Sequence, residues 1–374
     1  MKKSLLFFYF TFFALQFQVF AKVKNAVVFG EHSKIVQTME NGTLRIFMDM
    51  NGDFYPENVI SNNELETTGN AQLAIWAKKY PAQFQKIAQS YRLEITTYSK
   101  FNYLVLQDSI RQNLLRTINK QGRIIQTWVI HGYRKKITNE NTDNLTSTYE
   151  NSLCRKRIKP YVVNDSGHLF VEAYWDGKYL LTGGVKRVIQ LGRLFKKKAI
   201  PNAQQCGYGL RRLFSGIQCQ RINIITHSAG VHVVSSLLYN KKRGFSLPTP
   251  SQKDIRIAIT AAASSGKKHF KRYYKRNTNL DYAASDNYTL FNLINENDFV
   301  LLKRIGRLHF TKVLGNTTLG CNRKSESQKL KSYFEKKYNN SIFLEGYVTQ
   351  SRNHLFKAYI ASAGFNGVLK FLYN

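Results

Sequence analysis

Apolar runs of strand length alternate with amphipathic stretches from Ile124 to the end of the chain. Several runs are apolar at consecutive positions, as are strands that are buried on both faces of a parallel sheet. The runs read RIIQTWVIHGY, GHLFVEAYW, RINIITH, DIRIAITAAA, YTLFNLINEND and SIFLEGYVT. This alternation predicts an α/β fold with a mostly parallel sheet, helices on both faces, and one domain over residues 124–374.

Residues 22–123 show a different pattern, with short β-like pieces followed by two helical stretches. Asn51-Gly52 lies between apolar runs and predicts a hairpin. The first helix should break at Pro81, and the second should end at Gly122. We therefore expect an N-terminal α+β extension, which either completes the first strands of the sheet or covers a site.

The same turn also resembles the start of a calcium loop, because Asp49, Asn51 and Asp53 alternate. Phe54 and Ile60 occupy the positions where such a loop needs Gly and a bidentate Glu. We therefore predict no metal site here.

The first 21 residues place two lysines before an apolar run that ends on Val19-Phe20-Ala21. This pattern predicts a signal peptide cleaved after Ala21 and export to the periplasm or beyond the cell, with an N-terminal membrane anchor as the alternative. Export would permit disulfides. The four cysteines, Cys154, Cys206, Cys219 and Cys321, allow three pairings, and unpaired buried thiols are the alternative.

A formal net charge of +33 makes the chain strongly basic. Such a surface attracts polyanions such as an anionic membrane or envelope surface. Segment 267–276, KKHFKRYYKR, interleaves basic and aromatic residues as nucleic-acid-binding segments do. Because the export signal favours a headgroup-binding or solvated basic face, we do not expect nucleic acid as the partner.

The run RINIITH stops at Ser228-Ala229-Gly230 before a helical stretch begins. A serine on a tight strand-to-helix turn stands clear of the sheet, beside the N–H groups that open the helix. A serine at a helix start is also a common N-cap, so a nucleophile needs a base and an oxyanion pocket elsewhere in the chain. His131-Gly132-Tyr133 ends an earlier run, Asp298 follows a later one, and His354 follows the last.

With THSAG, NEND and RNH in this order, residues 124–374 resemble an α/β-hydrolase fold serine hydrolase of the esterase or lipase kind. The resemblance implies Ser228 as nucleophile, Asp298 as acid and His354 as base. It implies an oxyanion hole at Ala229, Gly132 and Tyr133, with no cofactor. The strand-to-helix turn that carries Ser228, called the nucleophile elbow in this family, departs from the usual pattern because it begins with Thr226 rather than Gly. No hydrophobic lid insertion is evident in the sequence.

Glu296 is a rival acid, and His309 is a rival base. His227 is expected either in packing or in the lining of the pocket, His232 in a structural role, and His131 in shaping the oxyanion loop. The resulting hypothesis is an exported hydrolase that cleaves a lipid or small acyl ester. The alternatives are an inactive hydrolase-like binding protein of the cell envelope and an acyltransferase or thioesterase with the same triad.

Overall fold

The structure is a computed structural model of the 374-residue chain. It describes residues 39–40, 42–56, 72–122, 124–133, 147–162, 167–175, 194–238, 254–265, 288–302, 304–305, 308–309, 318–337, 343–349 and 351–374. The predicted signal peptide (1–21) and the basic segment 267–276 lie outside these ranges.

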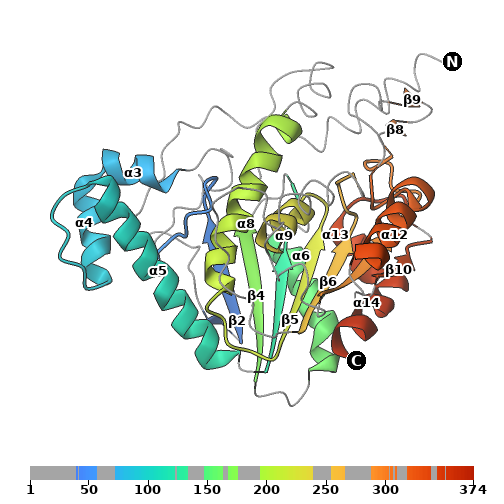
Figure 1. The fold of residues 1–374 in the computed structure, drawn as a ribbon, viewed down its shortest axis with the longest axis horizontal. Helices are drawn as coiled ribbons and strands as arrows, with labels where there is room; N and C mark the ends of the chain where they lie inside the picture. Colours follow the sequence, from blue (N-terminus) through green and yellow to red (C-terminus); the bar gives the residue numbers. More distant parts are fainter. Residues whose placement is uncertain are drawn as a thin grey trace.

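A central sheet organises the molecule (Figure 1). Seven of its strands are parallel, and β1 joins one edge in antiparallel pairing. In spatial order the strands are β1 (Met39–Glu40), β2 (Thr43–Met48), β4 (His168–Trp175), β3 (Ile125–Ile130), β5 (Arg221–His227), β6 (Asp254–Thr260), β7 (Tyr288–Ile294) and β10 (Phe343–Tyr347). The prediction of an α/β fold with a mostly parallel sheet is confirmed.

The sheet is buried on both faces because side chains alternate along each strand. Trp128 and Ile130 of β3 point into one apolar cluster, whereas Val129 between them points into a second cluster. Consecutive apolar residues in β3 and its neighbours are therefore buried in one or the other of the two apolar clusters. This two-sided burial explains why the strands read as continuous apolar runs.

Helices cover both faces. On the Trp128 face lie α3 (Leu73–Lys79), α4 (Pro81–Ser90), α5 (Lys100–Gln121), α8 (Ile200–Phe214), α9 (Gly230–Leu238) and α12 (Gln328–Lys337), of which α8 crosses in front of the strands in Figure 1. On the opposite face lie α6 (Ser147–Ile158), α13 (Phe356–Ala361) and α14 (Gly364–Tyr373). Short pieces complete the description: η1 (Lys159–Tyr161), η2 (Phe195–Ala199), η3 (Arg323–Ser327), β8 (Arg304–Ile305) and β9 (Leu308–His309).

The N-terminal helices begin and end where the sequence predicts. Pro81 is the first residue of α4, and the chain leaves helical geometry at Tyr80, so the break at the proline is confirmed. The Ser99 hydroxyl accepts a hydrogen bond from the Asn102 amide at the start of α5, as an N-cap does. Gly122 caps the other end of α5.

Residues 42–56 complete the sheet, because β2 pairs in parallel with β4 along its whole length. The sheet is thus continuous across the predicted boundary at residue 124. The hairpin predicted at Asn51-Gly52 forms as a tight turn, with Gly52 at a φ of 82°. After the turn the chain makes an isolated bridge from Phe54 back to Met48 rather than a second strand.

The register of the parallel strands brings their carboxyl ends to one edge. Ile130 of β3 is level with Thr226 of β5, and His227 of β5 is level with Thr260 of β6. Ile294 of β7 is level with Tyr347 of β10. Every segment in which the sequence predicts a functional residue leaves the sheet at this edge.

All four cysteines lie in described segments, and none of them forms a disulfide. Cys154, Cys206 and Cys321 are buried, so the structure corresponds to the alternative of buried thiols. Burial raises the pKa of the Cys154 thiol, which keeps it protonated. Among the described helices, none has the length and apolar character needed to cross a bilayer.

Candidate active site

Ser228 occupies a strained turn between β5 and α9. Its φ of 53° puts a non-glycine residue in the left-handed region, at a cost of roughly 1–2 kcal/mol. Two backbone hydrogen bonds to the neighbouring strand end fix this conformation. The Ser228 N–H donates to the Thr260 carbonyl (2.9 Å), and the Ala263 N–H donates to the Ser228 carbonyl (3.1 Å).

Two glycines let three segments approach one another at this turn. A Cβ at Gly230 would lie 2.2 Å from the Thr226 hydroxyl oxygen, so no larger residue fits without a shift. A Cβ at Gly132 would lie 2.9 Å from both the Ser228 Cβ and the His227 Nδ1. The loop after β3 therefore lies directly against the serine.

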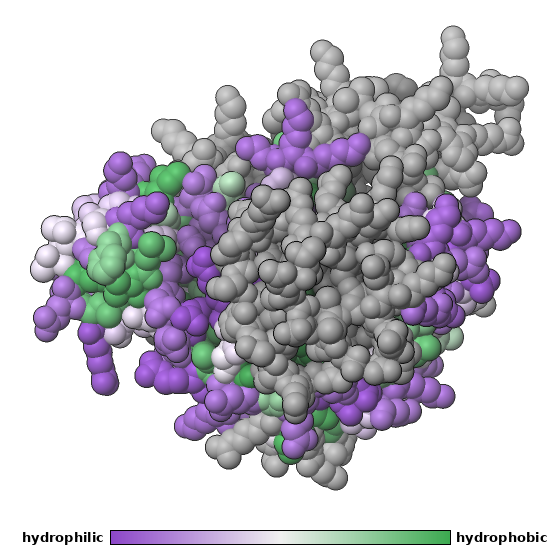
Figure 2. Space-filling view, in the orientation of Figure 1, coloured by the Kyte–Doolittle hydropathy of each residue, from purple (hydrophilic) through white to green (hydrophobic). Residues whose placement is uncertain are grey.

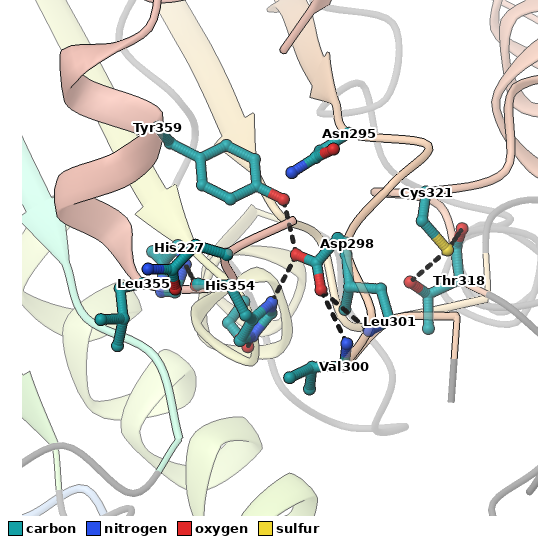
Figure 3. Close-up of polar contacts among 12 residues, drawn as sticks. His227, Asn295, Asp298, Val300, Leu301, Thr318, Cys321, His354, Leu355 and Tyr359 are labelled. Carbon is teal, nitrogen blue, oxygen red and sulfur yellow. Dashed lines mark hydrogen bonds and ion pairs between the residues drawn. The ribbon is translucent and has the colours of Figure 1, made fainter. Parts of the chain in front are cut away.

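His354 connects Ser228 to Asp298 through its two ring nitrogens. The Nε2 atom lies 2.9 Å from the Ser228 Oγ, and the Nδ1 atom lies 2.7 Å from the Asp298 Oδ2. A carboxylate can only accept, so Nδ1–H donates to Asp298, and Nε2 is left to accept from the serine hydroxyl. The structure thus brings together the three side chains that the sequence nominates. Figure 3 shows the contact between His354 and Asp298.

Asp298 is wholly buried, and it is held by four hydrogen bonds. Its Oδ1 accepts from the backbone amides of Val300 and Leu301, at 3.0 Å each. Its Oδ2 accepts from His354 and also from the Tyr359 hydroxyl, at 2.7 Å each. Asp298 therefore both caps its own turn and is the partner of His354.

Tyr359 is a contact that the sequence analysis missed. It lies on α13, shortly after His354, and its side chain points at the Asp298 carboxylate in Figure 3. Burial raises the pKa of Tyr359 far above its usual value, and the neighbouring Asp298 charge adds to this effect. The hydroxyl therefore stays protonated and donates to the carboxylate at neutral pH.

His227 and His131 hold the backbone around the site. The His227 Nε2–H donates to the His354 carbonyl (2.8 Å), and the His227 ring stacks on Phe356. His131 accepts from the Trp175 amide at Nε2 (3.0 Å) and donates from Nδ1 to the Gly132 carbonyl (2.8 Å). As expected, His131 shapes the loop that carries Gly132 and Tyr133, whereas the contact of His227 with His354 was not foreseen.

The three expected oxyanion donors lie on segments that border the serine. Ala229 is buried directly before α9, where the first amides of a helix have no partner within the helix. Gly132 and Tyr133 lie on the loop that packs against Ser228. The Tyr133 ring contacts Phe195 of η2, which in turn contacts the ring of His232.

The rival residues take other positions. Glu296 is exposed, whereas Asp298 is buried beside the histidine. His309 lies on β9, which pairs with β8 in a separate two-stranded sheet. Among the described residues, no three His, Cys, Asp or Glu side chains gather in a way that could hold a metal ion.

The carboxylate considered as a calcium ligand, Asp49, is used by the backbone instead. Its Oδ1 accepts from the amides of Asn51 (2.8 Å) and Asp53 (3.1 Å), and its Oδ2 accepts from the amide of Leu73 (2.8 Å). Asp53 accepts from the Tyr103 hydroxyl (2.7 Å). These bonds join the turn after β2 to α3 and α5.

No protein-family model matches the chain, and no curated protein matches it. The functional assignment therefore depends on the residues of the site. A serine on a strained turn, a histidine in contact with its oxygen and a buried carboxylate behind the histidine can together perform nucleophilic attack on a carbonyl group.

Proposed function

We propose that this protein is an exported serine hydrolase of the α/β-hydrolase kind that cleaves carboxylic esters. Ser228 would be the nucleophile, His354 the base and Asp298 the acid. The observation that carries the proposal is the pair of contacts made by His354, 2.9 Å to the Ser228 Oγ and 2.7 Å to the Asp298 Oδ2. The strained backbone of Ser228 supports it further, because such strain gathers at functional sites.

The proposed acylation starts when the Ser228 Oγ attacks the ester carbonyl carbon and its proton passes to the His354 Nε2. A bond forms between Oγ and carbon, and the carbonyl electron pair moves to oxygen. When the tetrahedral intermediate collapses, the bond to the alcohol breaks, and the alcohol oxygen takes the proton from His354. Water then attacks the acyl-enzyme by the same route and releases the acid.

Asp298 would hold His354 in the required tautomer and stabilise the imidazolium that forms. The oxyanion would be held by the backbone N–H of Ala229 and by N–H groups of the Gly132-Tyr133 loop. Support for the second donor segment comes from the close contact of Gly132 with Ser228, because a donor must lie beside the attacked carbonyl.

The substrate class in this proposal is a lipid or small acyl ester, with export after removal of residues 1–21 and a basic surface that favours anionic envelope material. The absence of a cofactor requirement follows from the mechanism itself, because proton transfer and acyl transfer need only the side chains named.

The test is intact-mass spectrometry after incubation with a fluorophosphonate, which forms a stable phosphonyl ester with an activated serine. We expect one adduct on the wild-type protein and none on Ser228→Ala or His354→Ala. His232→Ala, a buried histidine outside the triad, serves as the matched control and should still be labelled. A folded wild-type protein that takes no label would refute the mechanism and favour a binding protein of the same fold.

A further inference from the structure

Helices α3 and α5 expose large apolar side chains. Phe101 and Leu104 on the first turns of α5 keep 73% and 50% of their surface accessible, and Ile75 on α3 keeps 59%. Phe101 and Leu104 are three residues apart in a helix, so they lie on the same side of α5. Figure 2 shows apolar surface on this side of the molecule, at the left, among hydrophilic residues.

Lysines accompany these apolar side chains. Lys78 and Lys79 lie three and four residues after Ile75, so they share its side of α3, and Lys100 directly precedes Phe101. All three lysines are exposed. Between residues 72 and 122 the sequence has eight lysines and arginines but two acidic residues, so this part of the surface is strongly positive.

The patch is also tied to the edge of the sheet that carries Ser228. The Asp49 carboxylate, just beyond the carboxyl end of β2, accepts a hydrogen bond from the first amide of α3. The Asp53 carboxylate in the same turn accepts one from Tyr103 on the first turn of α5. The starts of α3 and α5 are therefore anchored to the same edge as the candidate active site (Figure 1).

We propose that Ile75, Phe101 and Leu104, together with Lys78, Lys79 and Lys100, form a docking patch for an anionic phospholipid bilayer. Apolar tips that stand among lysines suit a membrane interface, where the rings and aliphatic groups enter the acyl boundary and the ammonium groups meet lipid phosphates. A protein partner with an apolar face would not need the lysines. The charge around the patch therefore selects the anionic lipid surface.

The test is sedimentation of the full chain with vesicles of phosphatidylcholine alone and vesicles that also contain phosphatidylglycerol. We expect binding to the anionic vesicles that weakens as salt rises. The double variant Phe101→Ser/Leu104→Ser should bind about tenfold more weakly, because it loses two side chains that enter the membrane. The triple variant Lys78→Gln/Lys79→Gln/Lys100→Gln should lose the preference for anionic vesicles.

The matched control is Leu344→Ser on the opposite edge strand β10, where the side chain is 41% exposed. This variant should bind vesicles as the wild type does. All variants carry the same residues 1–21, so binding by that apolar segment alone would leave the double variant unchanged and would overturn the proposal. A fall in molecular mass in solution for the double variant, with vesicle binding retained, would instead identify the patch as a contact between copies.

Vesicle binding does not depend on the proposed hydrolysis. Ser228→Ala should sediment with anionic vesicles as the wild type does while taking no fluorophosphonate label. If the wild type is labelled but does not bind vesicles, the docking patch is refuted and the hydrolase remains. If the wild type binds vesicles but is not labelled, the hydrolase is refuted and the docking patch remains.

Discussion

Two aspartates lie beyond the carboxyl ends of parallel strands in this protein, and their side chains make different contacts. Asp49 follows β2, Asp298 follows β7, and both side chains are completely buried. Both accept hydrogen bonds from backbone amides of their own turn. In each case the carboxylate replaces water as the partner of amides that leave the regular sheet.

The difference lies in the second oxygen. The Asp49 Oδ2 accepts from another backbone amide, that of Leu73, so the carboxylate fastens two segments of chain. The Asp298 Oδ2 accepts from His354 and Tyr359, so it faces a titratable ring whose far nitrogen reaches Ser228. Burial of an aspartate at this edge therefore does not by itself indicate a catalytic role. The group that contacts the Oδ2 atom distinguishes the two aspartates.

The largest expected effect separates the two aspartates directly. Asp298→Asn keeps an oxygen for the amides of Val300 and Leu301 but turns an NH₂ group toward the His354 Nδ1, which favours the wrong tautomer. The fluorophosphonate labelling rate should fall by about 10³-fold or more. Asp49→Asn should leave the rate within about twofold of wild type. Equal losses of labelling rate in the two variants would show that the two aspartates do not differ in their roles.

The second expected effect comes from Gly132→Ala. The new Cβ would meet Ser228 and His227 at 2.9 Å and would push the Gly132-Tyr133 loop away from Ser228. We expect a loss of about 10²-fold in labelling rate. Gly42→Ala is the control, because its φ of 70° makes the substitution strained, yet nothing lies within 4 Å of the added Cβ. It should lower the melting temperature and leave labelling intact.

Tyr359→Phe should have a smaller effect, about tenfold on the labelling rate, because the His354 contact with Asp298 survives the loss of one charge-assisted hydrogen bond. The downfield Nδ1 proton of His354 in the nuclear magnetic resonance spectrum should also shift, since this proton shares the Asp298 oxygen with the tyrosine. Retention of both the rate and the proton position would show that Tyr359 is only packed there.

Substitution of Asp49 should change the stability of the fold rather than the labelling rate. Asp49→Asn places an amide NH₂ opposite the Leu73 N–H, so the free energy of unfolding should fall by about 1–3 kcal/mol in denaturant titrations at neutral pH.

Burial, with the neighbouring Asp53 as a further cause, raises the pKa of Asp49 well above its ordinary value. The folded state then holds more protons than the unfolded state above about pH 3.9, so stability should fall as pH rises from there through the folded pKa. Asp49→Asn should flatten this slope. An unchanged slope would mean that other groups control it.

The sequence was sufficient for six strands, β3, β4, β5, β6, β7 and β10, because each is a local apolar run. The triad was nominated because each of its members follows such a run. The pairing of β2 with β4 could not be predicted, since Thr43 and Phe170 are far apart in the chain and no local pattern specifies their contact. The breaks at Pro81 and Gly122 were predictable because proline and glycine act locally.

Other parts of the site had no local signal. Tyr359 looks in the sequence like any aromatic residue of a C-terminal helix, and its role depends on how α13 packs. His227 is adjacent to Ser228, yet its partner is the backbone carbonyl of His354, which no sequence pattern encodes. The alternating aspartates of the turn after β2 suggested a metal by type, whereas their oxygens are used by amides and by Tyr103.

The hydrogen-bonded residues of the candidate site are far apart in the chain, because 126 positions separate Ser228 from His354. Ser228 is synthesised before His354 and Tyr359, which lie in the C-terminal part of the described fold. A chain that stops before His354 contains Ser228 but lacks the histidine proposed to activate it. If Ser228 is the nucleophile, its reactivity therefore depends on a segment that is made long after the serine itself.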